Sequence, residues 1–72
     1  MNDNNAAPIR AVPVFEYSPT IDGFEVVERS TGRPVTGVYD TAAAANGRAY
    51  QLNGIARSGD LRALARALRS AD

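Results

Sequence analysis

Alternating apolar and polar residues between Phe24 and Arg29 predict a β-strand with one buried face. Phe24 and Val26 fall on one side of this strand, whereas Glu25 and Arg29 fall on the other. The next residues, 30–33, include Ser, Thr and Gly, which favour a turn. The strand should therefore continue into a hairpin.

A second apolar run, over residues 34–39, is the predicted return strand of that hairpin. Pro34 fits only at the start of this strand or on an open edge, because it has no N–H for the ladder. Gly37 lies inside the run and predicts a bulge or the close approach of another backbone. We expect this hairpin to organise the rest of the fold.

A further strand is predicted upstream, over residues Ile9–Tyr17. Pro13 interrupts this segment and makes it either an edge strand or an extended arm, two alternatives that the sequence leaves open. The pair Asp22–Gly23 predicts a tight turn between this segment and the hairpin. The sheet is accordingly expected to have two or three antiparallel strands.

A helix should follow the hairpin directly, because Asp40–Thr41 supplies side-chain oxygens that can cap its first turn. Gly54 suits the left-handed position after a last turn, so the helix is predicted to end at Asn53–Gly54. Gly47 inside the helix costs about 1 kcal/mol relative to Ala; close packing is the expected reason, and a kink is the alternative. One stripe of mostly small residues is expected to face the sheet: Ala45, Ala49 and Leu52.

The C-terminal residues have the clearest helical periodicity of the chain. The positions i, i+3, i+4 and i+7 of this pattern are Leu61, Leu64, Ala65 and Leu68. Ser58 or Asp60 is the predicted N-cap of this last helix. In the alternative arrangement, residues 24–52 form a sheet–helix unit, and the last helix is detached and free to pair.

These elements predict an α+β fold, with a two- or three-stranded antiparallel sheet followed by two helices packed on one face. Residues 1–8 are expected to be a disordered lead-in, and residues 9–72 a single small domain. A chain of 72 residues buries a thin core. Its predicted members are Phe24, Val26, Val35, Tyr39, Ala45, Ala49, Leu52, Leu61, Leu64 and Leu68.

The residue types that most catalytic sites require are missing, since the sequence contains no His, Cys or Lys. Glu25 and Glu28 would point to opposite faces of a strand and make a poor acid/base pair. We therefore expect no enzymatic activity, no cofactor and no metal site. The sequence shows no signal peptide, and no apolar run approaches the ~20 residues of a membrane span, so we expect a cytoplasmic protein with no membrane partner.

Charge is unevenly distributed, although the net charge is zero. Acidic residues outnumber arginines up to Asp40, and arginines outnumber acidic residues from Thr41 onward. The last helix has an arginine stripe that could follow a phosphate backbone, formed by Arg62, Arg66 and Arg69. The competing interpretation is an ordinary solvated helix face.

The order of elements from Phe24 to Leu52 resembles a recurrent hairpin–helix (ββα) pattern of short bacterial and phage proteins: strand, Thr-Gly turn, strand, aromatic-Asp-Thr cap and helix. The same order is similar to the AP2-like arm-binding domains of phage integrases, which read DNA with a basic sheet. The resemblance covers less than half of the chain. The strands here carry Glu16, Glu25 and Glu28, which would repel phosphate, so the sheet is not expected to read DNA.

Size and pattern also resemble small accessory proteins of phages and mobile elements, including anti-CRISPR inhibitors, which occupy a surface on a host protein complex. We therefore expect a non-enzymatic protein-binding module, with inhibition of a host defence complex as the leading interpretation. Arg and Tyr are enriched at binding hot spots. The candidate partner-binding residues are Arg48, Tyr50, Arg57, Arg62, Arg66 and Arg69.

Two other partners remain as alternatives. The first is nucleic acid, bound by an accessory domain that uses the arginine stripe of the C-terminal helix. The second is another copy of the chain, paired through the leucine stripe of that helix or through an unguarded strand edge at Val35, Val38 and Tyr39.

Overall fold

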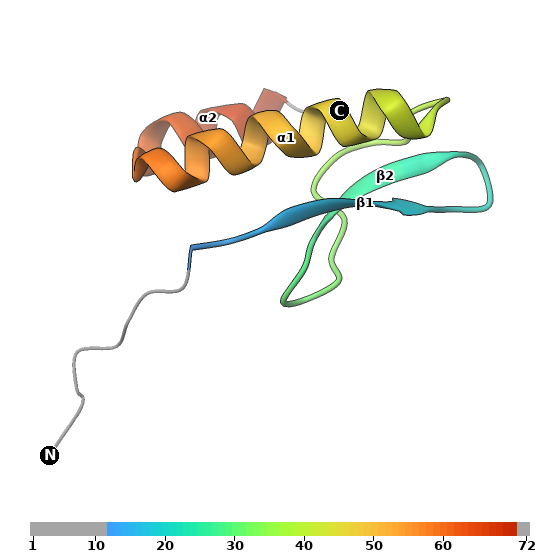
Figure 1. Ribbon diagram of the computed structural model, residues 1–72, viewed down its shortest axis with the longest axis horizontal. Helices are drawn as coiled ribbons and strands as arrows, with labels where there is room; N and C mark the ends of the chain where they lie inside the picture. The colour runs from blue at the N-terminus through green and yellow to red at the C-terminus, as the bar shows by residue number, and fades with distance from the viewer. Residues whose placement is uncertain (1–11, 71–72) are drawn as a thin grey trace, which may run out of the picture.

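The computed structural model describes residues 12–70, in which two strands are followed by two helices (Figure 1). The elements are β1 (Phe15–Pro19), β2 (Phe24–Glu28), α1 (Ala42–Ser58) and α2 (Leu61–Ser70). The predicted α+β fold, with an antiparallel sheet preceding two helices, is confirmed. The predicted lead-in over residues 1–8 and the beginning of the predicted first strand lie outside the described residues.

The sheet consists of β1 and β2, which pair antiparallel with Phe15 opposite Glu28 and Pro19 opposite Phe24. The upstream segment is therefore a true strand, although it begins after Pro13. Pro19 is the last residue of β1, and its backbone groups point away from β2. The ladder therefore needs no N–H from this residue, and a proline is compatible with it. Pro13 precedes the strand and Pro19 is its last residue, so neither removes a ladder hydrogen bond.

The segment over residues 34–39 lies along the other edge of β2 but is not a regular strand, so the prediction of a regular return strand is wrong. Its bridges join Val27 to Pro34 and Phe24 to Tyr39, so residues 35–38 oppose only residues 25–26. The extra residues form a bulge around Gly37, as the sequence predicted.

The hydroxyl of Thr36 replaces a backbone acceptor inside this bulge. It accepts the N–H of Val26 at 3.1 Å and donates to the carbonyl of Gly37 at 2.8 Å. Val26 is completely buried, so without this hydroxyl its N–H would have no partner. A single side chain thereby allows the segment to depart from ladder geometry without leaving a buried donor unpaired.

Gly23, between β1 and β2, is required by the close approach of the bulged segment. A side chain at this position would collide with the carbonyl oxygen of Tyr39 and lie 2.9 Å from Cγ1 of Val38. The approach is close because Phe24 and Tyr39 exchange backbone hydrogen bonds at 2.9 Å and 2.6 Å. Its φ of 156° is also one that other residues rarely adopt.

Helix α1 begins at the predicted N-cap, where Oγ1 of Thr41 accepts the N–H of Ala44 at 3.1 Å. The helix does not end at Gly54 as predicted but continues to Ser58, and Gly59 takes the left-handed conformation with φ of 80°. Continuing the helix buries Ala56 and partly buries Ile55 against the core. This burial outweighs the roughly 1 kcal/mol that a glycine costs inside a helix.

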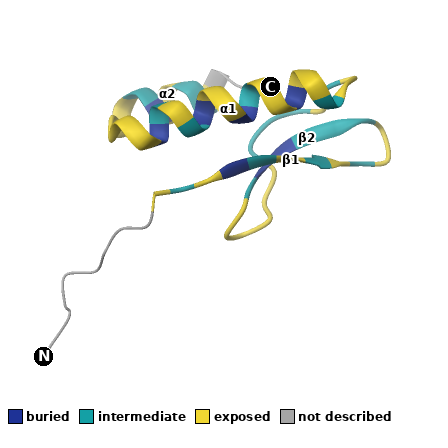
Figure 2. Ribbon diagram, viewed as in Figure 1, coloured by how far each residue is buried: buried dark blue, intermediate teal, exposed yellow. Residues whose placement is uncertain are grey.

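The core lies between the sheet and the inner face of α1, where buried residues line the side of the helix that faces the strands (Figure 2). Ala45, Ala49 and Leu52 are buried as predicted, and their small size allows the helix to approach the strands closely. Three buried residues were not predicted: Phe15, Val27 and Ala56. The core cluster comprises Phe15, Val26, Ala45, Ala49, Leu52, Ala56 and Leu64.

Helix α2 packs against α1 rather than directly on the strands. Asp60 is its N-cap, since its Oδ1 accepts the N–H of Ala63 at 3.0 Å. Leu64 is buried and Leu68 packs against the core cluster, so the helix is not detached. The prediction of Leu61 as a core residue is wrong: its side chain is 66% exposed, because it opens the helix at the interhelical turn, beyond the cluster.

Candidate binding surface on the helices

The predicted partner-binding residues lie on the two helices, and all but Arg48 are exposed. Tyr50 is the most prominent apolar side chain among them, with 74% of its surface accessible. On α2 the spacing of Arg62, Arg66 and Arg69 places them on one side of the helix, opposite Leu64. The arginine stripe predicted from the sequence is thus an exposed helix face.

Arg48 has a different environment from the other candidates. Its guanidinium donates from Nη1 to Oε1 of Gln51 at 2.8 Å and from Nη2 to the carbonyl of Ala67 at 3.0 Å. The second bond joins α1 to α2, so Arg48 stabilises the packing of the helices whatever else it contacts. Its participation in partner binding stays a prediction.

The helical surface is strongly basic. Neither α1 nor α2 contains an acidic residue, and Asp60 between them is engaged as a cap. Within residues 12–70, no ion pair or hydrogen bond involves the side chains of Arg57, Arg62 or Arg69. These guanidinium groups are therefore available to an acidic partner.

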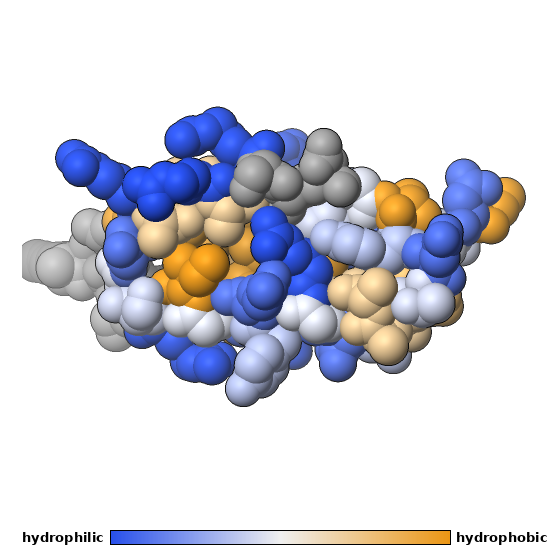
Figure 3. Space-filling model, turned by 90° about the horizontal axis from the view of Figure 1, so that it is seen from above, coloured by the Kyte–Doolittle hydropathy of each residue, from blue (hydrophilic) through white to orange (hydrophobic). Residues whose placement is uncertain are grey.

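A shallow groove crosses the outer surface of α1, lined by Arg48, Tyr50, Gln51, Gly54, Ile55 and Ser58. Gly54 is one of its lining residues, and within residues 12–70 nothing lies within 4 Å of the position that a Cβ would occupy there. Seen from the helical side of the molecule, apolar surface lies beside a row of hydrophilic side chains (Figure 3). Aromatic, aliphatic and basic groups thus meet on one face.

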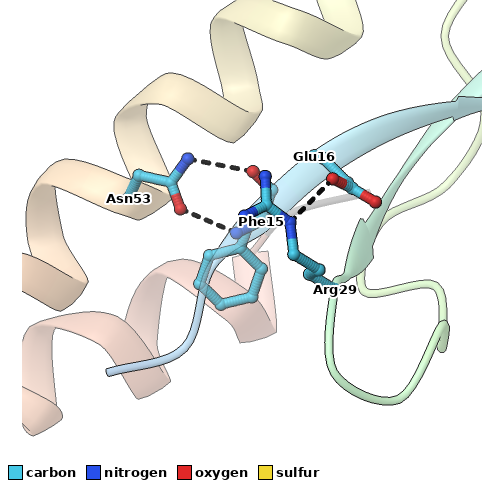
Figure 4. A network of polar contacts seen from close by, with 4 residues as sticks. All are labelled: Phe15, Glu16, Arg29 and Asn53. Atoms are coloured by element: carbon cyan, nitrogen blue, oxygen red, sulfur yellow. Dashed lines mark hydrogen bonds and ion pairs between the residues drawn. The ribbon is translucent and has the colours of Figure 1, made fainter. Parts of the chain in front are cut away.

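Asn53 covers the free edge of β1 at Phe15, a contact that the sequence did not reveal (Figure 4). Its Oδ1 accepts the N–H of Phe15 at 2.7 Å, and its Nδ2 donates to the carbonyl of Phe15 at 2.9 Å. The amide thereby takes the place of a neighbouring strand at this point of the edge. The contact joins residues 38 positions apart, which no local pattern indicates.

The strands carry three of the six acidic residues within 12–70: Glu16, Glu25 and Glu28. Glu16 pairs with Nε of Arg29 at 3.0 Å, and Glu28 accepts from the hydroxyls of Ser30 and Thr31. Both partners of the ion pair are substantially exposed, so its contribution to stability is about 0–1 kcal/mol. The sheet thus offers little basic surface for phosphate.

Residues 12–70 contain no group of three or more acidic, His or Cys side chains able to hold a metal ion. Among the same residues, neither helix has both the length and the apolar character that crossing a membrane requires. Comparison with known protein families, with curated proteins and with solved structures finds no match to this chain.

Proposed function

We propose that this protein is a non-enzymatic binding module whose partner is another protein, contacted by the exposed face of α1 and α2. The observation that supports this proposal is the exposed Tyr50 beside an apolar groove, on a surface where Arg57, Arg62 and Arg69 have no side-chain partner within residues 12–70. Tyr and Arg supply much of the energy at protein interfaces. A partner with acidic groups around an apolar centre would complement this surface.

Within this proposal, the partner is a host protein or protein complex in the cytoplasm, and the module acts as a phage or mobile-element inhibitor of a host defence complex, in the manner of anti-CRISPR proteins. The support for this narrower function is the resemblance in size and element order. A small rigid body with an exposed binding face suits a protein that acts by occupying a surface.

Affinity capture from bacterial lysates tests the proposal. The bait is the tagged protein, compared with a variant in which Tyr50→Ala is combined with Arg57→Glu and Arg62→Glu. Arg33→Glu is the matched control, since Arg33 is an exposed arginine in the turn after β2. We expect a stoichiometric protein partner with the wild type and the control, and none with the triple variant. Failure of the wild type to retain a partner from several candidate hosts would contradict the proposal.

Nucleic acid is the second candidate partner, favoured by the arginine face of α2 and the lack of any acidic residue on that helix. Phosphate contacts release counterions, so log K should fall with log salt at a slope of about −0.9 for each contact. Binding of a short DNA duplex at low salt, lost at moderate salt and on replacing Arg62 and Arg69 with Glu, would favour this function. Absence of such binding at low salt would eliminate it.

A further inference from the structure

We infer that the partner presents an acidic amphipathic helix, which lies along α1 and inserts one apolar side chain into the groove beside Gly54. We call this part of the groove, lined by Gln51, Gly54, Ile55 and Ser58, the notch. This inference rests on the proposed function and specifies the kind of partner that the surface fits. It comes from the shape of the groove, the position of Gly54 and the charges around it.

The shape of the groove is that of a hole into which a side chain of a second helix can pack. Four of its lining residues, Gln51, Gly54, Ile55 and Ser58, fall at i, i+3, i+4 and i+7. Four residues with this spacing form the hole that receives a knob in helix–helix packing. Tyr50, one turn before Gly54, adds an exposed aromatic wall on the same side.

Within residues 12–70, Gly54 makes no close contact that would require a glycine. At about 100° per residue, it lies on the side of α1 opposite the buried stripe of Ala45, Ala49, Leu52 and Ala56. No atom is near enough to exclude a side chain, and the helix continues through it. Gly47 is equally open, so the close packing predicted for it is wrong. Because it does not line the groove, it is a natural control.

The charges around the notch select an acidic occupant. Arg57 is three residues after Gly54 and is therefore its neighbour on the helix surface. Neither helix has an acidic side chain that could compensate Arg57, Arg62 or Arg69. Carboxylates flanking the apolar positions of a docked helix would meet these guanidinium groups, whereas lysines in the same places would be repelled.

A helix fits this protein better than an added strand does. The amide of Asn53 occupies both backbone groups of Phe15 at the free edge of β1, and Pro19 has no N–H to offer there. The opposite edge of β2 is covered by the bulged segment over residues 34–39. Between Phe15 and Pro19, the free edge of β1 therefore leaves only a short stretch around Tyr17 for an incoming strand.

Fluorescence anisotropy with two synthetic peptides tests the inference. Both are helical peptides of about five turns with leucines on one face; one has Glu at the flanking positions and the other Lys. We expect the Glu peptide to bind the wild type at least about tenfold more tightly than the Lys peptide. Gly54→Leu, which fills the notch, should weaken binding of the Glu peptide at least about tenfold, and Gly47→Ala should leave it unchanged.

Thermal unfolding shows whether Gly54→Leu loses binding because the notch is filled or because the fold is destabilised. Both glycine substitutions replace a poor helix former at an open position, so both variants should melt at or above the wild-type temperature. Loss of binding in a Gly54→Leu variant with an unchanged or raised melting temperature supports the inference. Equal binding of the two peptides, or undiminished binding by Gly54→Leu, overturns it.

The capture experiment distinguishes this inference from the proposed function. A partner retained by Gly54→Leu but lost by the triple variant would overturn the notch while leaving the binding function intact. Failure to capture any partner would instead contradict the function itself. Light scattering tests whether a second copy of the chain occupies the notch instead. A wild-type dimer that Gly54→Leu dissociates would show this and would overturn the inference of an acidic partner helix.

Discussion

Asn53 on α1 holds Phe15 on β1 by both of its backbone groups, through hydrogen bonds of 2.7 Å and 2.9 Å. Because α1 also covers the inner face of the sheet, one helix both buries the apolar side of β1 and closes part of its edge. The outer side of the same helix is left for contacts with other molecules. The inner face of α1 thus belongs to the core, and its outer face is the binding surface that we propose.

Replacing Asn53 with Ala should destabilise the protein by about 1–3 kcal/mol, because two hydrogen bonds to a partly buried backbone are lost. The uncovered edge should also promote association at high concentration. Urea unfolding and light scattering measure the two effects. Asn46→Ala is the control, because Asn46 is exposed on α1; similar stability of the two variants would show that the Asn53 bonds contribute nothing.

Replacing Thr36 with Val should cost about 1–3 kcal/mol, because the buried N–H of Val26 loses its acceptor while the side-chain shape is kept. Thr31→Val is the comparison at an exposed turn residue: its hydroxyl bonds with Glu28 and with the N–H of Arg33 are open to water, so losing them should cost less than losing the Thr36 hydroxyl. Urea unfolding of the two variants checks the difference. Equal midpoints would contradict the role assigned to the Thr36 hydroxyl.

Glycine-to-alanine substitutions should have opposite effects at two positions. Gly23→Ala should destabilise by about 1–3 kcal/mol or more, because the new methyl group meets the Tyr39 carbonyl at a φ that disfavours alanine. Gly54→Ala should stabilise by about 0.5–1 kcal/mol, since α1 gains a better helix former in open space. Melting temperatures of the two variants, measured by circular dichroism, should move in opposite directions.

The leucines of α2 should differ sharply in their contribution to stability. Leu64→Ala should cost about 2–5 kcal/mol, because this side chain is buried in the core cluster. Leu61→Ala should cost far less, since Leu61 is mostly exposed. Comparable losses in urea unfolding would mean that α2 packs differently.

Self-association through the leucine stripe of α2 should not occur, because Leu64 and Leu68 already pack against the core of their own chain. Light scattering at micromolar concentration should give a single species near 7.6 kDa. A species of twice that mass, dissociated by Leu61→Ala, would contradict this expectation.

Local chemistry was sufficient to predict much of the fold. The strand at Phe24, the cap at Thr41 and the buried stripe of Ala45, Ala49 and Leu52 each depend on residues close together in sequence. The exposed arginine face of α2 followed from helical periodicity in the same way. These features needed no knowledge of distant neighbours.

The errors arose where distant contacts overrode a local signal. Gly54 predicts the end of a helix, but the burial of Ala56 against the core stabilises a helix that continues to Ser58. The choice of β1 as the partner of β2 depends on Phe15, whose burial and edge contact come from α1. The groove could not be predicted either, since it requires Gly54 to lie inside a helix rather than at its end.

Hydrogen exchange of the protein with its captured partner tests the central claim, that the outer face of α1 and α2 is the binding surface, most directly. Binding should slow amide exchange over residues 50–58 and 61–69 and leave residues 15–28 unchanged. Protection concentrated on β1 and β2, with exchange in the helices unaltered, would contradict the account.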